Sequence, residues 1–182
     1  MRVGEALALE VADLQGDTLR IRQNLDQCKL DTPKTDAGMR EVDLAPELAT
    51  MVRDHIGDRS TGFIFRTRNG GPIRQRNVLR MLHSILTGMG KPKLGFHAFR
   101  RFRVTHLRKN MVPEDLIKFW IGHAPQTVTD EYSKLKHDVE FREHVAERVG
   151  PGFSLSRQLY PVVPQFSAMN DAQLVVESSQ RP

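Results

Sequence analysis

The stretch from His97 to His123 constrains the fold most strongly, because the ends of two successive helices can be recognised in it. His97 opens a basic run, HAFRRFRVTHLRK, that is typical of a helix. Residues three apart share one helix face, so His97 and Arg100 are expected to point toward the same target. Pro113, followed by two acids, is typical of the first turn of a helix, and Gly122 is typical of its end. The sequence therefore predicts two consecutive helices, with His123 directly after the second.

Four short motifs follow one another along the sequence: Arg2 to Leu9, His97-x-x-Arg100, Ile121-Gly122-His123 and Thr129-x-x-Tyr132. Together they resemble the catalytic domain of the tyrosine recombinases, the phage integrase family. That family carries an arginine followed three residues later by an acid and then by A-L-x-L. Further along it carries the patterns H-x-x-R, L-G-H and T-x-x-Y. Each pattern occurs by chance in many proteins, but four in the family's order form a specific signal.

The resemblance implies a site that binds the phosphate at which DNA is cut. Arg2 and Arg100 would hold its non-bridging oxygens, since a guanidinium can bind such oxygens through two hydrogen bonds. Glu5 would support Arg2, and His123 would donate a hydrogen bond to a phosphate oxygen. Taken alone, Arg2 and Glu5 could equally be an ordinary ion pair on an amphipathic helix.

The resemblance also implies how the DNA strand would be broken. Tyr132 would be the nucleophile and would become joined to the 3′-phosphate. Because a tyrosine hydroxyl has a pKa of about 10, it needs an acceptor for its proton, and His97 is the candidate. Lys34 would protonate the leaving 5′-hydroxyl, since the family carries a lysine on a β-hairpin at this place; Lys29 is a distant second candidate. Taken alone, Tyr132 could be a core aromatic residue and His123 a helix C-terminal residue.

A run without acidic residues points to nucleic acid as the partner. The net charge is +5, and from Arg59 to Pro113 there are thirteen Lys and Arg residues but no Asp or Glu. Like charges in such a run repel one another unless a polyanion neutralises them. The alternative is an ordinary solvated basic face whose charge is balanced by acidic residues from other parts of the fold. We predict contacts with double-stranded DNA from six arginines: Arg66, Arg68, Arg74, Arg76, Arg101 and Arg103.

The chain is predicted to form one α+β domain that is mainly helical, with a small antiparallel sheet or hairpin. The domain is expected to span residues 1–150, and residues 151–182 are expected to form a C-terminal tail. The tail contains four prolines and many Ser and Gln residues, and it is expected to be disordered. The elements expected after an initial helix are a strand at 17–23, a hairpin at 28–44, helices at 45–57 and 74–88, a short strand at 63–65 and a last helix at 139–149. Val78, Leu82, Ile85 and Leu86 are expected to be buried.

Several alternatives stay open at this point. The family normally carries a DNA-clamping domain and further helices before its first arginine, so activity is expected to be impaired by truncation. The alternatives are a non-catalytic DNA-binding remnant, or a protein that pairs with an intact recombinase through its last helix or tail. The type IB topoisomerases share the chemistry, but the L-G-H to T-x-x-Y layout favours the recombinases. No metal, cofactor or membrane contact is expected, and a single cysteine is compatible with a bacterial or phage protein in the cytoplasm.

Overall fold

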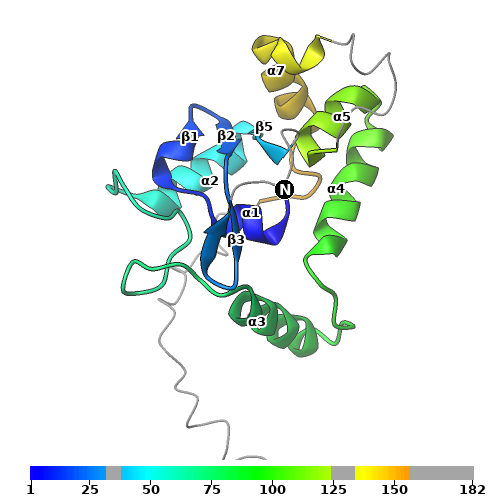
Figure 1. Cartoon of the computed structure of the whole chain (residues 1–182). Helices are drawn as coiled ribbons and strands as arrows, with labels where there is room; N and C mark the ends of the chain where they lie inside the picture. Colours follow the sequence, from blue (N-terminus) through cyan, green and yellow to red (C-terminus); the bar gives the residue numbers. More distant parts are fainter. Residues whose placement is uncertain (32–37, 124–133, 156–182) are drawn as a thin grey trace, which may run out of the picture.

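The computed structural model describes residues 1–31, 38–123 and 134–155, and its parts are arranged around the short first helix (Figure 1). A small sheet and α2 lie on one side of this helix, α4 and α5 lie on the other, and α3 and α7 lie at opposite ends (Figure 1). The helices are α1 Val3–Leu7, α2 Pro46–Ile56, α3 Gln75–Gly88, α4 His97–Lys109, α5 Glu114–Ile121 and α7 Val139–Val149, with 3₁₀ turns at Val11–Asp13 and Leu135–His137. The strands are β1 Leu14–Gln15, β2 Thr18–Ile21, β3 Asn24–Asp26, β4 Lys29–Asp31 and β5 Arg40–Asp43.

The three-stranded sheet is antiparallel in the order β1-β2-β5. In its central pair, Thr18 lies opposite Asp43 and Ile21 lies opposite Arg40. One apolar cluster packs this sheet against α2, and Ile64 is fully buried in it. The strand predicted at 17–23 is therefore confirmed, as is the helix predicted at 45–57.

The helices α4, α5 and α7 enclose a second apolar cluster. Leu107 comes from α4, Leu116 and Ile117 from α5, and Val145 from α7, and all four are almost completely buried. Helix α5 ends at Gly122, which has the left-handed φ of +71° that favours glycine. The predicted pair of consecutive helices is thus confirmed, together with the glycine that ends the second one.

The third cluster joins α1, β3 and the N-terminal part of α3 through Leu7, Leu25 and Ile73, with Val78 packed against it. Beyond this contact, α3 has no buried residue. The prediction that its apolar residues are core is therefore wrong for Ile85, which is 51% exposed, whereas Leu82 and Leu86 are half-buried. The hydrophobic pattern identified the helix correctly, but it overstated how deeply the apolar residues of that helix are buried.

Two predicted strand pairings also differ from the structure. Instead of one hairpin over 28–44, β4 pairs with β3, and β5 pairs with β2. The turn that joins β3 to β4 consists of Gln27 and Cys28, both with positive φ. The strand predicted at 63–65 is reduced to a single antiparallel bridge between Phe63 and Glu10. Glu10 is the residue before the 3₁₀ turn Val11–Asp13, so among the described residues there is no neighbouring strand at this point with which the segment could form a longer ladder. In the part of the chain that is described, no helix is long and apolar enough to cross a membrane.

Candidate active site

Arg2 and Glu5 are tied together at the start of α1. Arg2 is the N-cap residue, and the Glu5 carboxylate accepts hydrogen bonds from its backbone N–H at 2.6 Å and from its Nη1 at 3.1 Å. An acid that reaches back to the N-cap N–H satisfies a donor that the helix leaves unpaired. The Glu5 side chain is buried, whereas that of Arg2 is 56% exposed. The helix thus fixes the base of Arg2 and leaves its guanidinium facing outward.

Arg40, from the first position of β5, completes the surroundings of Glu5. Its guanidinium donates to both carboxylate oxygens, with Nη2 to Oε2 at 2.9 Å and Nη1 to Oε1 at 3.3 Å. Burial alone would raise the pKa of the Glu5 carboxyl, but the hydrogen bonds from Arg40 and from the Arg2 backbone outweigh it and lower that pKa. Glu5 is therefore a carboxylate at neutral pH, and it links two arginines.

Arg100 extends from the first turn of α4 toward the end of α5. Its Nη2 donates to the backbone carbonyl of Ile121. Its Nη1 is buried, yet it has no hydrogen-bond partner among the described residues. Burial and the nearby Arg2 guanidinium both lower the pKa of Arg100, which puts the two positive side chains within electrostatic reach of one another. An unsatisfied buried donor beside a second guanidinium is suited to binding an anion.

His123 is held in place by the end of α5. The N–H of Gly122 donates to the carbonyl of Phe119 and that of His123 to the carbonyl of Lys118, the pair of bonds that defines a Schellman motif. The His123 side chain is exposed, yet the neighbouring protein atoms remove some of its water, and this desolvation, followed by the charges of Arg100 and Arg2, lowers the pKa of His123 below its ordinary value of 6.5. At neutral pH the ring is therefore mainly uncharged and keeps one N–H donor.

The structure thus brings together the start of α1, the first turn of α4 and the end of α5, which Figure 1 shows meeting near the centre of the molecule. Three side chains from these elements (Arg2, Arg100 and His123) lie within electrostatic reach of one another, and we call this set the phosphate site. Their donors could hold several oxygens of one phosphate group. Over the described ranges, no three His, Cys, Asp or Glu side chains gather as metal ligands would.

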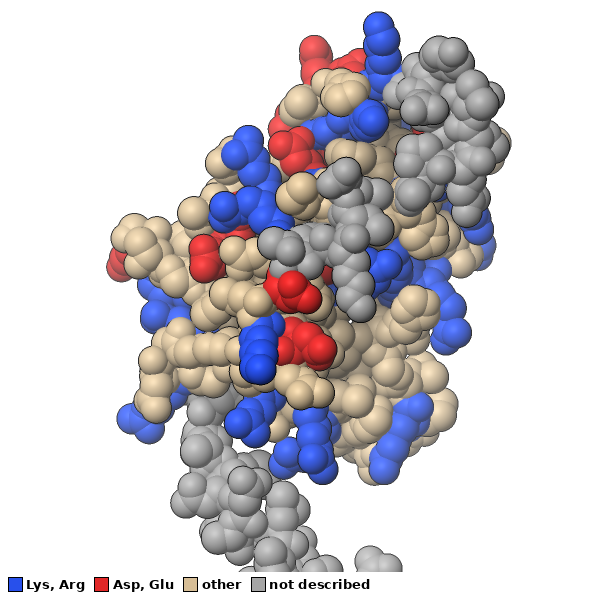
Figure 2. Space-filling view, in the orientation of Figure 1, with Lys and Arg blue, Asp and Glu red and all other residues tan. Residues whose placement is uncertain are grey.

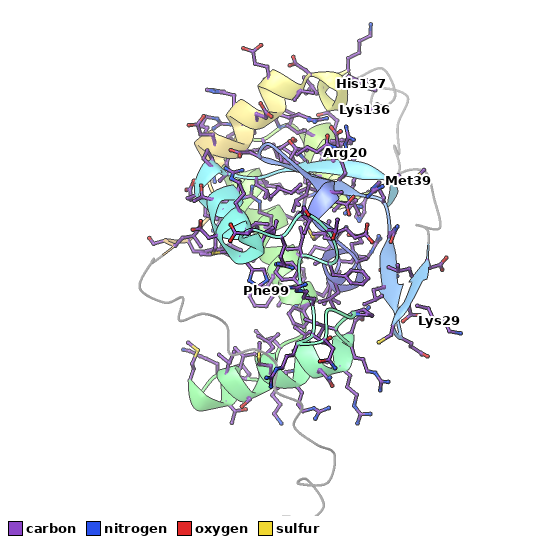
Figure 3. The ribbon with its side chains drawn as sticks, turned by 90° about the vertical axis from the view of Figure 1, so that its left-hand side faces the viewer. Arg20, Lys29, Met39, Phe99, Lys136 and His137 are labelled. Carbon is purple, nitrogen blue, oxygen red and sulfur yellow. The ribbon has the colours of Figure 1, made fainter. Side chains whose placement is uncertain are left out.

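Of the other predicted catalytic residues, only His97 and the second lysine candidate, Lys29, lie in the described part of the chain. His97 is exposed at the first position of α4, one turn before Arg100. Lys29 lies at the outer edge of the molecule, on the β3–β4 hairpin (Figure 3). Lys34 and Tyr132 lie outside the described residues. The roles of Lys34, His97 and Tyr132 therefore stay predictions.

The predicted DNA-contacting arginines divide into two groups. Five of them are exposed: Arg66, Arg68, Arg74, Arg76 and Arg101. Arg103 differs, because it is half-buried and its guanidinium donates to the carbonyl of Gly150. Burial lowers the pKa of Arg103. In the view of Figure 2 the end of the molecule occupied by α3 displays Lys and Arg and no acidic side chains.

Sequence reasoning missed a set of buried polar residues that hold the elements of the site together. Besides Arg40, it consists of Asp43, Trp120 and Arg142. The Asp43 carboxylate accepts from the Trp120 indole N–H at 2.7 Å and pairs with Arg142 at 3.0 Å. These partners are 77 and 99 residues from Asp43 along the chain. The only local signal was the presence of charged residues in a strand whose ends are buried, which does not identify a partner.

Comparisons with curated proteins find recombinases and integrases. The chain is 25% identical over 159 residues to a protein named tyrosine recombinase XerC-like from Caldanaerobacter subterraneus subsp. tengcongensis, a match that covers 71% of this chain and 41% of that protein. It is 24% identical over 150 residues to the integrase of Staphylococcus phage L54a, covering 71% of this chain and 42% of the relative. The match therefore spans about two fifths of the length of these relatives.

Solved structures show the same fold. The Tn1549 transposon integrase, determined in complex with transposon right end DNA, matches with a TM-score of 0.61 at 20% sequence identity, over 81% of this chain and 54% of that one. A second structure of that integrase, with circular intermediate DNA, matches with a TM-score of 0.59 at 19% identity, over 79% of this chain and 56% of that one. The family model described as the phage integrase family matches residues 1–138. Through this match and the shared fold, the chain belongs to the phage integrase family, whose members include the tyrosine recombinases.

Proposed function

We propose that this chain supplies the catalytic domain of a site-specific DNA recombinase, which cuts and rejoins DNA through a 3′-phosphotyrosine intermediate. The observation that supports the proposal most is the buried Nη1 of Arg100, which has no partner among the described residues. It belongs to the phosphate site, whose three side chains lie within electrostatic reach of one another. The family assignment and the DNA held by the solved relatives support the same proposal.

In the proposed reaction, the Tyr132 oxygen attacks the phosphorus of the scissile phosphate. A bond forms between this oxygen and phosphorus while the bond from phosphorus to the 5′-oxygen breaks. The tyrosine proton passes to His97, and Lys34 donates a proton to the departing 5′-oxygen. The phosphate site stabilises the charge on the non-bridging oxygens in the transition state. Because the energy of the broken bond is kept in the phosphotyrosine, another 5′-hydroxyl can reverse the reaction without a further energy source.

Cleavage by the chain alone is expected to be slow. Arg2 stands before a helix of only five residues, and its side chain is 56% exposed. Short helices are marginally stable on their own, and their terminal residues fray. The arginine that must contact the phosphate is therefore held mainly by the single Glu5 carboxylate. Bound DNA would add the missing contact and hold Arg2 in place.

We further propose that the five exposed arginines bind double-stranded DNA and that the protein acts on DNA in the cytoplasm of a bacterial host. Contacts of this kind position a duplex without reading its sequence. Further recombinase protomers would be contacted through the segment after residue 155. Helix α7 itself is less suited to this role, because it buries Val145, Ala146 and Val149 within its own chain.

A covalent adduct between protein and DNA tests the proposal. The protein is incubated with a pool of nicked duplexes, each with a randomised central sequence, in which the short cleaved fragment diffuses away and prevents religation. Adducts are then separated on a denaturing gel. We expect a band that disappears in Tyr132→Phe and persists in EDTA. Tyr160, the other of the two tyrosines, provides the matched control, and Tyr160→Phe should retain the band.

Three outcomes would contradict the proposal. A band that survives in Tyr132→Phe would assign the nucleophile to another residue. The absence of a band, together with salt-sensitive retention of the duplex in a native gel, would leave a DNA-binding protein without strand cleavage. Loss of both signals would show that the chain alone does not hold DNA.

A further inference from the structure

The guanidinium of Arg40 is the most completely enclosed charge near the phosphate site. Its side chain is 1% exposed and makes four hydrogen bonds: two to Glu5, one at 2.9 Å to the Trp120 carbonyl and one at 3.0 Å to the Gly38 carbonyl. An arginine with these bonds cannot rotate without leaving charges unpaired in the interior. Arg40 is therefore a fixed point in this part of the fold.

Three of the four hydrogen bonds of Arg40 reach two of the segments that carry the phosphate site, α1 and the last turn of α5. Glu5 in turn accepts hydrogen bonds from the backbone and side chain of Arg2. The Trp120 carbonyl belongs to the last turn of α5, next to the Ile121 carbonyl that accepts from Arg100. One side chain thus connects the support of Arg2 with the part of α5 from which His123 follows and on which Arg100 rests.

Gly122 brings the end of α5 into close contact with this guanidinium. A Cβ atom at Gly122 would lie 2.6 Å from Arg40 Nη1 and 2.8 Å from its Cζ. Both distances are well below normal contact, so only glycine allows the backbone to pass the guanidinium at this point. The approach determines how far the backbone before His123 lies from the Arg40–Glu5 pair.

Stability alone does not account for a buried ion pair at this position. The cost of removing two charges from water often equals or exceeds their attraction, and apolar residues of similar size often stabilise a fold as well or better. A bidentate arginine–carboxylate pair also fixes the orientation of the two side chains relative to each other, because it forms two parallel hydrogen bonds. Residues that hold functional groups in place to within a fraction of an ångström need a fixed orientation of this kind.

We propose that Arg40 is a positioning residue for the phosphate site: through Glu5 it sets Arg2, and through the Trp120 carbonyl it sets the backbone that supports Arg100 and His123. This inference rests on the proposed function, since it concerns the same phosphate site. On this inference, the contacts that Arg40 of β5 makes with α1 and α5 orient the charged side chains of the site, in addition to packing these elements together.

Two conservative substitutions separate positioning from simple charge effects. Glu5→Gln removes a negative charge beside the phosphate site, so electrostatics alone predicts tighter phosphate binding. Arg40→Lys keeps the positive charge but loses the bidentate pair, so electrostatics alone predicts unchanged binding. If Arg40 acts by positioning, both Glu5→Gln and Arg40→Lys should lower the affinity for inorganic phosphate. We expect each variant to bind it at least fivefold more weakly than the unaltered protein. The probe is inorganic phosphate, followed by NMR through the His123 ring signals.

Ile117→Ala is the control for a general loss of stability. Ile117 belongs to α5 and is fully buried in the apolar cluster that α4, α5 and α7 enclose, and it makes no contact with the ion pair through a side-chain hydrogen bond. Its truncation should destabilise the protein while its phosphate affinity stays within twofold of the unaltered protein, at a temperature where the variants are folded. If one of the two charge variants does not fold, the other still gives the decisive comparison, and failure of both to fold would assign the pair to stability and overturn the inference.

The outcomes also separate this inference from the proposed function. Equal or tighter phosphate binding by Glu5→Gln, or unchanged binding by Arg40→Lys, would overturn the inference even if the protein cleaves DNA. Absence of phosphate binding by the unaltered protein would overturn it as well. If phosphate binds and is weakened as expected but no covalent adduct forms, the positioning role stands and strand cleavage by this chain is refuted.

Discussion

Replacing Gly122 by alanine should destabilise the protein more than the same change at another glycine with a similar positive φ. Gly122 has a φ of +71° and Gly90 a φ of +67°, so an alanine at either position is strained by about 1–2 kcal/mol. Around Gly90 a Cβ would meet nothing within 4 Å, whereas at Gly122 it would meet the Arg40 guanidinium at 2.6 Å. The four hydrogen bonds of Arg40 oppose its displacement, and overpacking of this kind costs about 1–3 kcal/mol.

The comparison can be made by urea denaturation. Trp120 is the only tryptophan of the chain and is 5% exposed, so its fluorescence reports the unfolding of the region concerned. We expect Gly122→Ala to lose about 1–3 kcal/mol more of the free energy of unfolding than Gly90→Ala, with the urea dependence unchanged. Combining Gly122→Ala with Arg40→Lys should cost less than the sum of the two single changes, because both disturb one contact. Equal losses at the two glycines would refute the reasoning.

Three further predictions concern pH and salt. Folding lowers the pKa of Glu5, so the contribution of this carboxylate to stability is complete above its ordinary pKa of 4.5 and is lost as the pH falls through the lowered pKa. When the free energy of unfolding is measured against pH, it should therefore fall below about pH 4.5, and Glu5→Gln should lack this fall. Bound phosphate should raise the pKa of the His123 ring, since it offsets the positive charges that lower it, and an NMR titration that shows no rise would contradict the phosphate site. Changing Arg74 and Arg76 to Gln should reduce the slope of log affinity for DNA against log salt by about 2. The control Arg53→Gln should leave this slope unchanged, because Arg53 is engaged with Asp17.

Some of the fold could be predicted because the signals lie within one turn of the element they define. Helix α5 is the clearest case: Pro113 stands at its N-cap position, two acids occupy its first turn, and Gly122 ends it with a positive φ. These preferences arise from the unpaired backbone groups and the dipole at helix ends, so they act locally. The strand β2 was recognisable for a similar reason, since its alternation has the period of a sheet with one buried face.

Other features carry no local signal. The two-residue turn of the β3–β4 hairpin contains Gln27 and Cys28 with positive φ, although such turns favour Asn and Gly. Nothing in these residue types predicts the turn, so the hairpin was expected further along the chain. For α3, the apolar spacing predicted a helix correctly, but it could not tell that Ile85 remains 51% exposed.

The site divides in the same way between sequence and tertiary structure. By itself, the sequence determined which residue types are available, their order and the two helix ends that carry Arg100 and His123. Only the tertiary structure decided that Arg40 lies against Glu5 and the Trp120 carbonyl, across separations of 35 and 80 residues. The physical reason is that helix ends are set by neighbouring backbone groups. The partner of a buried charge, by contrast, is set by whichever distant segments the core brings into contact with it.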